Sequence, residues 1–170
     1  MMKNSRFFVG IVLLTLNCLG SMALADTVVV NITGRVLASP CTLDAASSDM
    51  NVNLGAVPST DLATPGQVSN AVPFHLVVKS CPAATTNATL TFGGTEDTDA
   101  PGRYLNTGTA TNVAVEVFQA STLQGPGTSM TLPVQSDRTA TFNLQSRVYA
   151  KGQSTSGTII ATLQATFVYQ

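Results

Sequence analysis

Short segments in which apolar and polar residues alternate recur along this chain, separated by residues that form turns. Successive side chains of a β-strand point to opposite faces, so each such segment can bury one face and expose the other. No stretch of the mature chain sustains the 3.6-residue apolar period of an amphipathic helix. The pattern therefore predicts a single all-β sandwich domain. The expected strands are 73–79, 88–92, 112–118, 139–149 and 158–170, with a shorter one at 52–54, and the turn-rich breaks are 58–67, 93–102 and 125–127.

The beginning of the chain has the features of a secretory signal peptide. Lys3 and Arg6 precede a short apolar run at 7–16, and Ala23 and Ala25 supply the small residues of a cleavage site. The apolar run is too short to span a bilayer comfortably, and no later run approaches that length. We therefore expect cleavage after Ala25, export of residues 26–170, and no membrane insertion of the mature protein.

Two cysteines, Cys41 and Cys81, remain after this cleavage. Cysteine pairs in exported proteins are usually oxidised, so the sequence predicts one disulfide between them. The alternative is a pair of unbonded buried thiols, which an oxidising compartment disfavours.

Composition argues against nucleic-acid binding and against catalysis. The formal net charge is −1, and Lys79 and Lys151 are the only lysines of the mature chain, so no basic patch is available for phosphates. The only histidine, His75, lies in an expected strand, where a packed or surface residue is more typical than a general base. The acidic residues at 96–99 lack the spacing of a calcium loop, so a solvated loop is expected there. We find no nucleophile motif, metal-ligand cluster or phosphate loop, and predict no enzyme activity, cofactor or metal.

Both ends of the mature chain alternate strongly. In 158–170 one face carries Ile159, Ala161, Leu163, Ala165, Phe167 and Tyr169. Residues 26–38 form a second alternating segment, the N-terminal arm, with Val28, Val30, Ile32, Gly34, Val36 and Ala38 on one face. This pattern alone leaves open whether the arm is simply the first strand of the sandwich. Gly34 weakens that reading, because a glycine inside a strand forfeits side-chain packing.

Several features together resemble the subunits of chaperone–usher pili, especially the minor, non-tip subunits of type 1 fimbriae. They are the alternating arm with its glycine, the run Gly-x-Val-x-Ala-x-Pro-Cys at 34–41, and the second cysteine in the sequence KSCP at 79–82. Tyr169 is the penultimate residue, and Gly157 is the fourteenth residue from the C-terminus. The resemblance covers nearly all of the mature chain.

The resemblance implies an incomplete immunoglobulin-like β-sandwich that lacks its final strand, with an N-terminal donor-strand extension. The domains would be a signal peptide at 1–25, the arm at 26–38 and the pilin domain at 39–170. A periplasmic chaperone would first fill the groove left by the missing strand, and the arm of a neighbouring subunit would replace it at the outer-membrane usher. Val28, Val30, Ile32, Gly34 and Val36 would enter the neighbour's groove. The C-terminal strand paired with chaperone and donor would present Gly157, Ile159, Ala161, Leu163, Ala165, Phe167 and Tyr169.

The function implied is that of a structural subunit of a bacterial surface fimbria, which contributes to adhesion as part of the fibre. It would be exported through the periplasm and act outside the cell. Two alternatives remain open. One is a carbohydrate-binding adhesin that uses the loop with Glu96, Asp97, Asp99 and Tyr104, and the other is a subunit that terminates assembly at the fibre base. The sequence does not distinguish a major rod subunit from a minor adaptor.

Overall fold

The computed structural model describes residues 31–35 and 40–170. The chain divides into two units, Met1–Arg35 and Val36–Gln170, which are described separately. In the first unit, residues 31–35 are exposed and belong to no helix or strand. The second unit contains all the strands that the structure describes.

The larger sheet of the second unit is antiparallel, with the strand order β1-β2-β8-β5-β4 and with β6 paired to β5. Its long strands, β2, β8 and β5, match three of the alternating segments. The strands are β1 (Thr42–Leu43), β2 (Val72–Lys79), β8 (Ala140–Ala150), β5 (Val113–Gln119), β4 (Tyr104–Leu105) and β6 (Thr122–Leu123).

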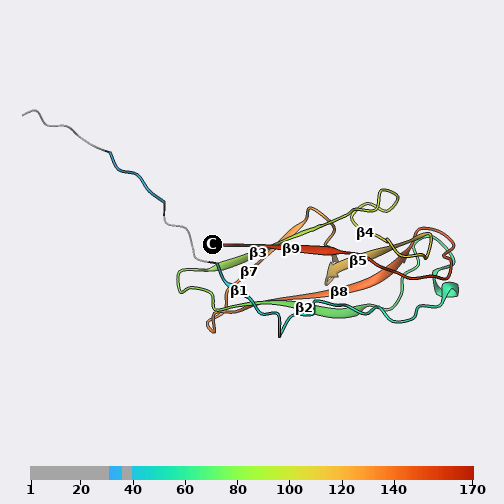
Figure 1. Cartoon of the computed structure of the whole chain (residues 1–170), viewed down its shortest axis with the longest axis horizontal. Helices are drawn as coiled ribbons and strands as arrows, with labels where there is room; N and C mark the ends of the chain where they lie inside the picture. Colours follow the sequence, from blue (N-terminus) through green and yellow to red (C-terminus); the bar gives the residue numbers. More distant parts are fainter. Residues whose placement is uncertain (1–30, 36–39) are drawn as a thin grey trace, which may run out of the picture. The chain divides into compact units, whose positions relative to one another are not determined.

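The smaller sheet has the order β7-β3-β9 and is also antiparallel. Its strands are β7 (Ser129–Pro133), β3 (Asn87–Gly94) and β9 (Leu163–Tyr169). Figure 1 shows the two sheets as two layers, with β3 and β9 in one and β2 and β8 in the other. The second unit is therefore a β-sandwich, as the alternating pattern predicts.

Alternation places the apolar side chains between the sheets. Every second residue along β2, β3 and β8 is buried, mostly in one main core, while Val148 and Ala150 at the end of β8 belong to a smaller cluster. The rings of Phe142 on β8 and Phe167 on β9 lie 5.6 Å apart and join the two layers directly. The most buried members of the core are Val78, Cys81, Ala88, Leu90, Phe92, Tyr104, Ala140 and Phe142.

A disulfide links Cys41, just before β1, to Cys81, just after β2. It fastens the beginning of the sandwich to the strand that β1 pairs with. Closing a loop of this length, with a sequence separation of 40, restricts the unfolded chain and contributes about 4 kcal/mol in the chain-entropy model. The predicted disulfide is confirmed.

The structure differs from the expected strands at several places, which include the unexpected two-residue strands β1, β4 and β6. Residues 52–54 are not a strand, because no strand in the described part of the chain pairs with them. The C-terminal strand begins at Leu163 rather than at residue 158, and β7 was not expected at all. The described residues contain one short 3-10 helix, η1 (Ser59–Leu62), and none of their helices has the length and apolarity needed to cross a membrane.

Candidate functional site

Strand β9 lies at the edge of the smaller sheet. One side of β9 pairs with β3 along its whole length, from Leu163 opposite Gly94 to Tyr169 opposite Ala88. Within the described residues, no strand pairs with its other side. An unpaired strand edge presents a row of free N–H and C=O groups that can bind another strand.

A second segment with an unpaired backbone faces the same region. Residues 50–57, here called the wall segment, make no backbone–backbone hydrogen bond within the part of the chain that the structure describes. Only side chains hold the segment: Val52 and Leu54 pack on the main core, and Leu54 and Val57 on a smaller cluster around Leu62. Met50 remains 61% exposed.

An apolar groove of about 920 Å³ is lined by the wall segment and by the C-terminal segment that leads into and includes β9. Val113, Val115 and Val117 of β5, with Phe74 and Leu76 of β2, line it from the opposite sheet. Concave, largely apolar grooves of this volume are typical of binding sites. The C-terminal residues that line it are Gly157, Thr158, Ile159, Ile160, Ala161, Leu163, Ala165 and Phe167.

The side chains of β9 are only partly buried, as expected for a strand with a neighbouring strand on one side only. Leu163, Phe167 and Tyr169 are only half-buried, and Ala165 is exposed, although all four share the apolar face of the strand. The Phe167 and Tyr169 rings stack in parallel, 6.4 Å apart. Burial beside the core raises the pKa of the Tyr169 hydroxyl, so this residue stays neutral at physiological pH.

A close approach of two backbones fixes one end of the groove. The loop residues Thr107 and Ala110 donate N–H bonds to the carbonyls of Ile160 and Thr158, at 2.8 and 3.0 Å. Gly157 lies so near this loop that an added Cβ would collide with the backbone of Thr109 and Ala110. These contacts explain why 158–162 runs extended beside a loop and joins no sheet until Leu163.

The groove is almost free of charge. Asp49 is the only charged residue among those that line it in the described part of the chain. An apolar strand could therefore enter the groove without burying any unpaired charge except that of Asp49, which directly precedes the wall segment.

Comparison with known proteins identifies the family of this chain. The family model described as "Fimbrial protein" matches residues 30–170. This chain belongs to the fimbrial protein family. Among its relatives, Protein FimG of Escherichia coli K12 is 33% identical over 164 residues, which covers 94% of this chain and 96% of FimG. The S-fimbrial adhesin protein SfaS of Escherichia coli O6:K15:H31 is 32% identical over 157 residues, or 91% of this chain and 92% of SfaS.

The fold also matches solved structures. The P pilus rod subunit PapA superimposes with a TM-score of 0.66 at 17% identity, covering 78% of this chain and all of PapA. The sandwich is thus of the immunoglobulin-like type found in pilus subunits. The fimbrial protein is a structural subunit that assembles with neighbouring subunits into a surface fibre and has a role in adhesion; it is not an enzyme.

Much of the N-terminal arm of this fimbrial subunit lies outside the described residues. That applies to Val28, Val30, Val36 and Ala38. Of the remaining arm residues, Ile32 is 91% exposed, and no atom lies within 4 Å of the position that a Cβ on Gly34 would take. The role of the arm stays a prediction.

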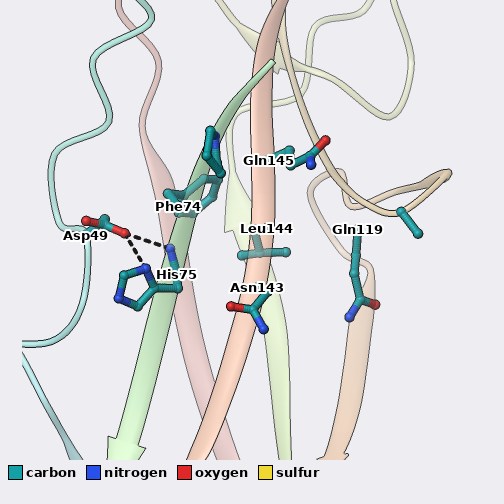
Figure 2. A pocket seen from close by; sticks show the side chains of 9 residues that line it. Asp49, Phe74, His75, Gln119, Asn143, Leu144 and Gln145 are labelled. Atoms are coloured by element: carbon teal, nitrogen blue, oxygen red, sulfur yellow. Dashed lines mark hydrogen bonds and ion pairs between the residues drawn. The ribbon is translucent and has the colours of Figure 1, made fainter.

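A smaller hollow of about 470 Å³ lies over β2, β8 and the end of β5. Figure 2 shows Asp49 reaching to His75 of β2, with the amides of Gln119, Asn143 and Gln145 nearby. His75 Nδ1 lies 2.7 Å from Asp49 Oδ2, and both side chains are nearly half exposed. His75 is thus a surface residue in contact with the Asp49 carboxylate.

The acidic loop considered for sugar binding is mostly exposed, as expected, and Glu96 and Asp99 lie at its surface, but Asp97 and the following Tyr104 are buried. Asp97 is 1% exposed and binds Lys151 Nζ at 2.8 Å, and Tyr104 is 1% exposed and donates its hydroxyl to the Gln124 carbonyl. Two of the four proposed sugar-binding residues are therefore unavailable to a ligand. No cluster of His, Cys, Asp or Glu able to hold a metal occurs among the described residues.

Sequence reasoning missed the wall segment as part of the site. The alternation of Met50, Val52 and Leu54 is a signal for this segment, but by itself it predicts only an ordinary strand. No local signal points to Asp49, because its partner His75 lies 26 residues further along the chain.

Proposed function

We propose that the groove is completed by a β-strand from another molecule, in two successive steps. A periplasmic chaperone supplies the strand first, and the N-terminal arm of the next subunit replaces it at the outer-membrane usher. Residues 1–25 direct export to the periplasm and are then removed. The observation that carries this proposal is an apolar groove with an unpaired backbone along both sides, β9 and the wall segment.

The arm suits this groove chemically. Its alternate side chains Val28, Val30, Ile32 and Val36 are apolar and of a size that fills shallow pockets. Burial of each contributes about 1.5–3 kcal/mol, so four contribute about 6–12 kcal/mol before the cost of ordering the arm. Hydrogen bonds to both unpaired edges would then fix direction and register. A fibre held by such joints needs no energy source outside the cell.

The open groove also favours a subunit that accepts a donor over one that terminates assembly. A terminating subunit needs a groove in which exchange cannot proceed, whereas this one is lined continuously from Gly157 to Phe167. The adhesin alternative loses support, because Asp97 and Tyr104 are buried. We retain adhesion as a property of the assembled fibre.

A donor-peptide assay tests the proposal. The oxidised mature chain, residues 26–170, is incubated with an excess of a fluorescein-labelled peptide of residues 26–38. We expect one peptide to bind per subunit, with a slow off-rate and a higher melting temperature. Peptides carrying Ile32→Asp or Gly34→Leu serve as controls and should bind at least about 100-fold more weakly, because each places a charge or a bulky group in the groove. Equal binding of the wild-type and Ile32→Asp peptides would show that the arm is not the donor.

A further inference from the structure

The wall segment depends on few attachments. Between Asp49 and the helix η1, the only backbone–backbone hydrogen bond of the described chain is the local one that the Pro58 carbonyl accepts from the Asp61 N–H. At the far end Leu62 is buried, and its carbonyl accepts a bond from the Ser154 N–H at 3.1 Å. At the near end, Asp49 is the last residue bonded to the sandwich before the wall begins.

Asp49 satisfies both backbone groups of His75. Its N–H donates to the His75 carbonyl at 2.8 Å, and its Oδ2 accepts the His75 N–H at 2.8 Å. The same Oδ2 lies 2.7 Å from His75 Nδ1, and Figure 2 draws the two contacts of this oxygen. The carboxylate thus takes the place of the backbone carbonyl that a continuing strand would offer to β2.

This substitution ends strand pairing at a defined residue. Before Asp49, the chain pairs with β2 through β1 and through the bond from Asp44 N–H to the Val77 carbonyl. After Asp49, the chain leaves β2 and becomes one side of the groove. Asp49 itself lines both the groove and the smaller hollow.

We propose that Asp49, through its bonds to His75, is the positioning residue that sets where the wall segment leaves β2, and so how closely an inserted strand is held. This inference rests on the proposed strand-binding function. A strand in the groove must bond to β9 on one side and to the wall on the other. If the bonds between Asp49 and His75 are lost, the wall segment can move away from the inserted strand. The inserted strand then keeps only its backbone hydrogen bonds to β9.

The positioning role is separable from a general role in stability. The side chains of His75 and Asp49 are 45% and 43% exposed, and ion pairs this exposed contribute little to global stability. Loss of the pair should therefore change the melting temperature of the subunit slightly while changing how long a donor stays bound.

The experiment measures dissociation of the labelled 26–38 peptide from the oxidised mature chain. With Asp49→Ala, which removes both contacts of Oδ2, we expect dissociation to be about five- to tenfold faster. With Asp49→Asn, an amide oxygen in the place of Oδ2 can still accept from both the His75 backbone N–H and the Nδ1–H, so the rate should return to within about twofold of the wild type. Asp44→Ala is the matched control, because it removes the Asp44–Lys79 ion pair from the same sheet outside the groove; its rate should equal that of the wild type.

Hydrogen exchange of the peptide-bound subunit gives a second readout. Amides of residues 50–57 should be protected in the wild type and in Asp49→Asn, and should exchange faster in Asp49→Ala. The inference is overturned if Asp49→Ala releases the peptide at the wild-type rate, or if Asp44→Ala accelerates release equally. Failure of the wild-type chain to bind any peptide would instead overturn the proposed function itself, and this inference with it.

Discussion

At the scale of single residues, Glu116 shows how a buried charge is accommodated in this sandwich. The Glu116 side chain is 4% exposed and is held by two arginines, with Arg103 Nη2 at 2.7 Å from one oxygen and Arg147 Nε at 2.6 Å from the other. The guanidinium of Arg103 stacks over the Tyr149 ring at 3.7 Å, and that of Arg147 over Phe118 at 4.7 Å. Both faces of β5 are therefore filled, one by the core and the other by this network.

Replacing Glu116 with glutamine should destabilise the subunit. Two arginines would lose their counter-charge while remaining stacked and partly desolvated, and breaking such a pair costs about 1–3 kcal/mol when the cations are partly exposed. Urea unfolding of the peptide-bound subunit measures the change. Glu96→Gln is the control, because Glu96 is exposed and accepts one bond, from the Gly102 N–H; it should cost less than about half as much. A Glu116→Gln variant as stable as the wild type would contradict the network's role.

At the scale of secondary-structure elements, the sequence identified strands that find a partner on both sides. β2, β3, β5 and β8 lie close to their expected ranges, because their alternation coincides with burial between two sheets. The wall segment has the same alternation but no neighbouring strand, so it stays extended and unpaired. β7 was missed because it is short and ends at a proline, Pro133. Whether a segment pairs depends on which strands lie beside it in the fold, and the local sequence pattern does not contain that information.

The same limit applies to the candidate site, where the local pattern predicts the strand residues but not the long-range contacts. The apolar face of 159–169 is predictable from its period of two, and the structure places its members from Ile159 to Phe167 along the groove, whereas Tyr169 stacks on Phe167 outside the lining. Asp49, His75 and the 106–110 loop are not predictable in this way, because their contacts span 26 to 54 residues of sequence. Only the folded chain brings such residues together.

Two glycine substitutions test the contact between Gly157 and the 106–110 loop at one end of the groove. In Gly157→Ala, the added Cβ meets the backbone of Thr109 and Ala110, which cannot move aside as a flexible side chain could. We expect a loss of about 1–3 kcal/mol in the free energy of unfolding and weaker donor-peptide binding. In the matched variant Gly152→Ala, the nearest atoms lie at 3.7 Å, an ordinary contact, so stability should hardly change. Identical unfolding curves for the two variants would refute the packing argument.

At the scale of the whole molecule, one incomplete sandwich explains both the stability and the reactivity of the subunit. The disulfide, the core and the Glu116 network stabilise the fold. The groove, in contrast, leaves apolar surface exposed and backbone groups unpaired. An open groove of this kind favours aggregation, and on the proposed function a donor strand that fills it should stabilise the subunit. Stability measurements on this protein therefore belong to the peptide-filled state.

In that state, alkaline pH should unfold the subunit through two internal groups. Burial raises the pKa of the Tyr104 hydroxyl above its ordinary value of 10.0, so its ionisation favours the unfolded chain. Partial burial opposes the charge on Lys151, but its bonds to Asp97 and Asp99 outweigh this and raise its pKa above 10.5. Both groups therefore bind protons more tightly when folded, and the stability they provide is complete below pH 10 and is lost as the pH rises further.

Urea unfolding across the range from pH 7 to 12 measures this dependence. We expect the free energy of unfolding to be nearly constant to about pH 9 and then to fall, with Tyr104 contributing up to about 1.4 kcal/mol per pH unit. Tyr104→Phe removes one titrating group and should make the fall shallower, even though the lost hydrogen bond to Gln124 lowers stability at pH 7. The two effects are distinguishable because one changes the slope above pH 10 and the other the plateau below it. An unchanged slope in Tyr104→Phe would mean that the alkaline transition arises elsewhere, in Lys151 or in the tyrosine beside the groove, Tyr169, whose pKa is also raised by burial.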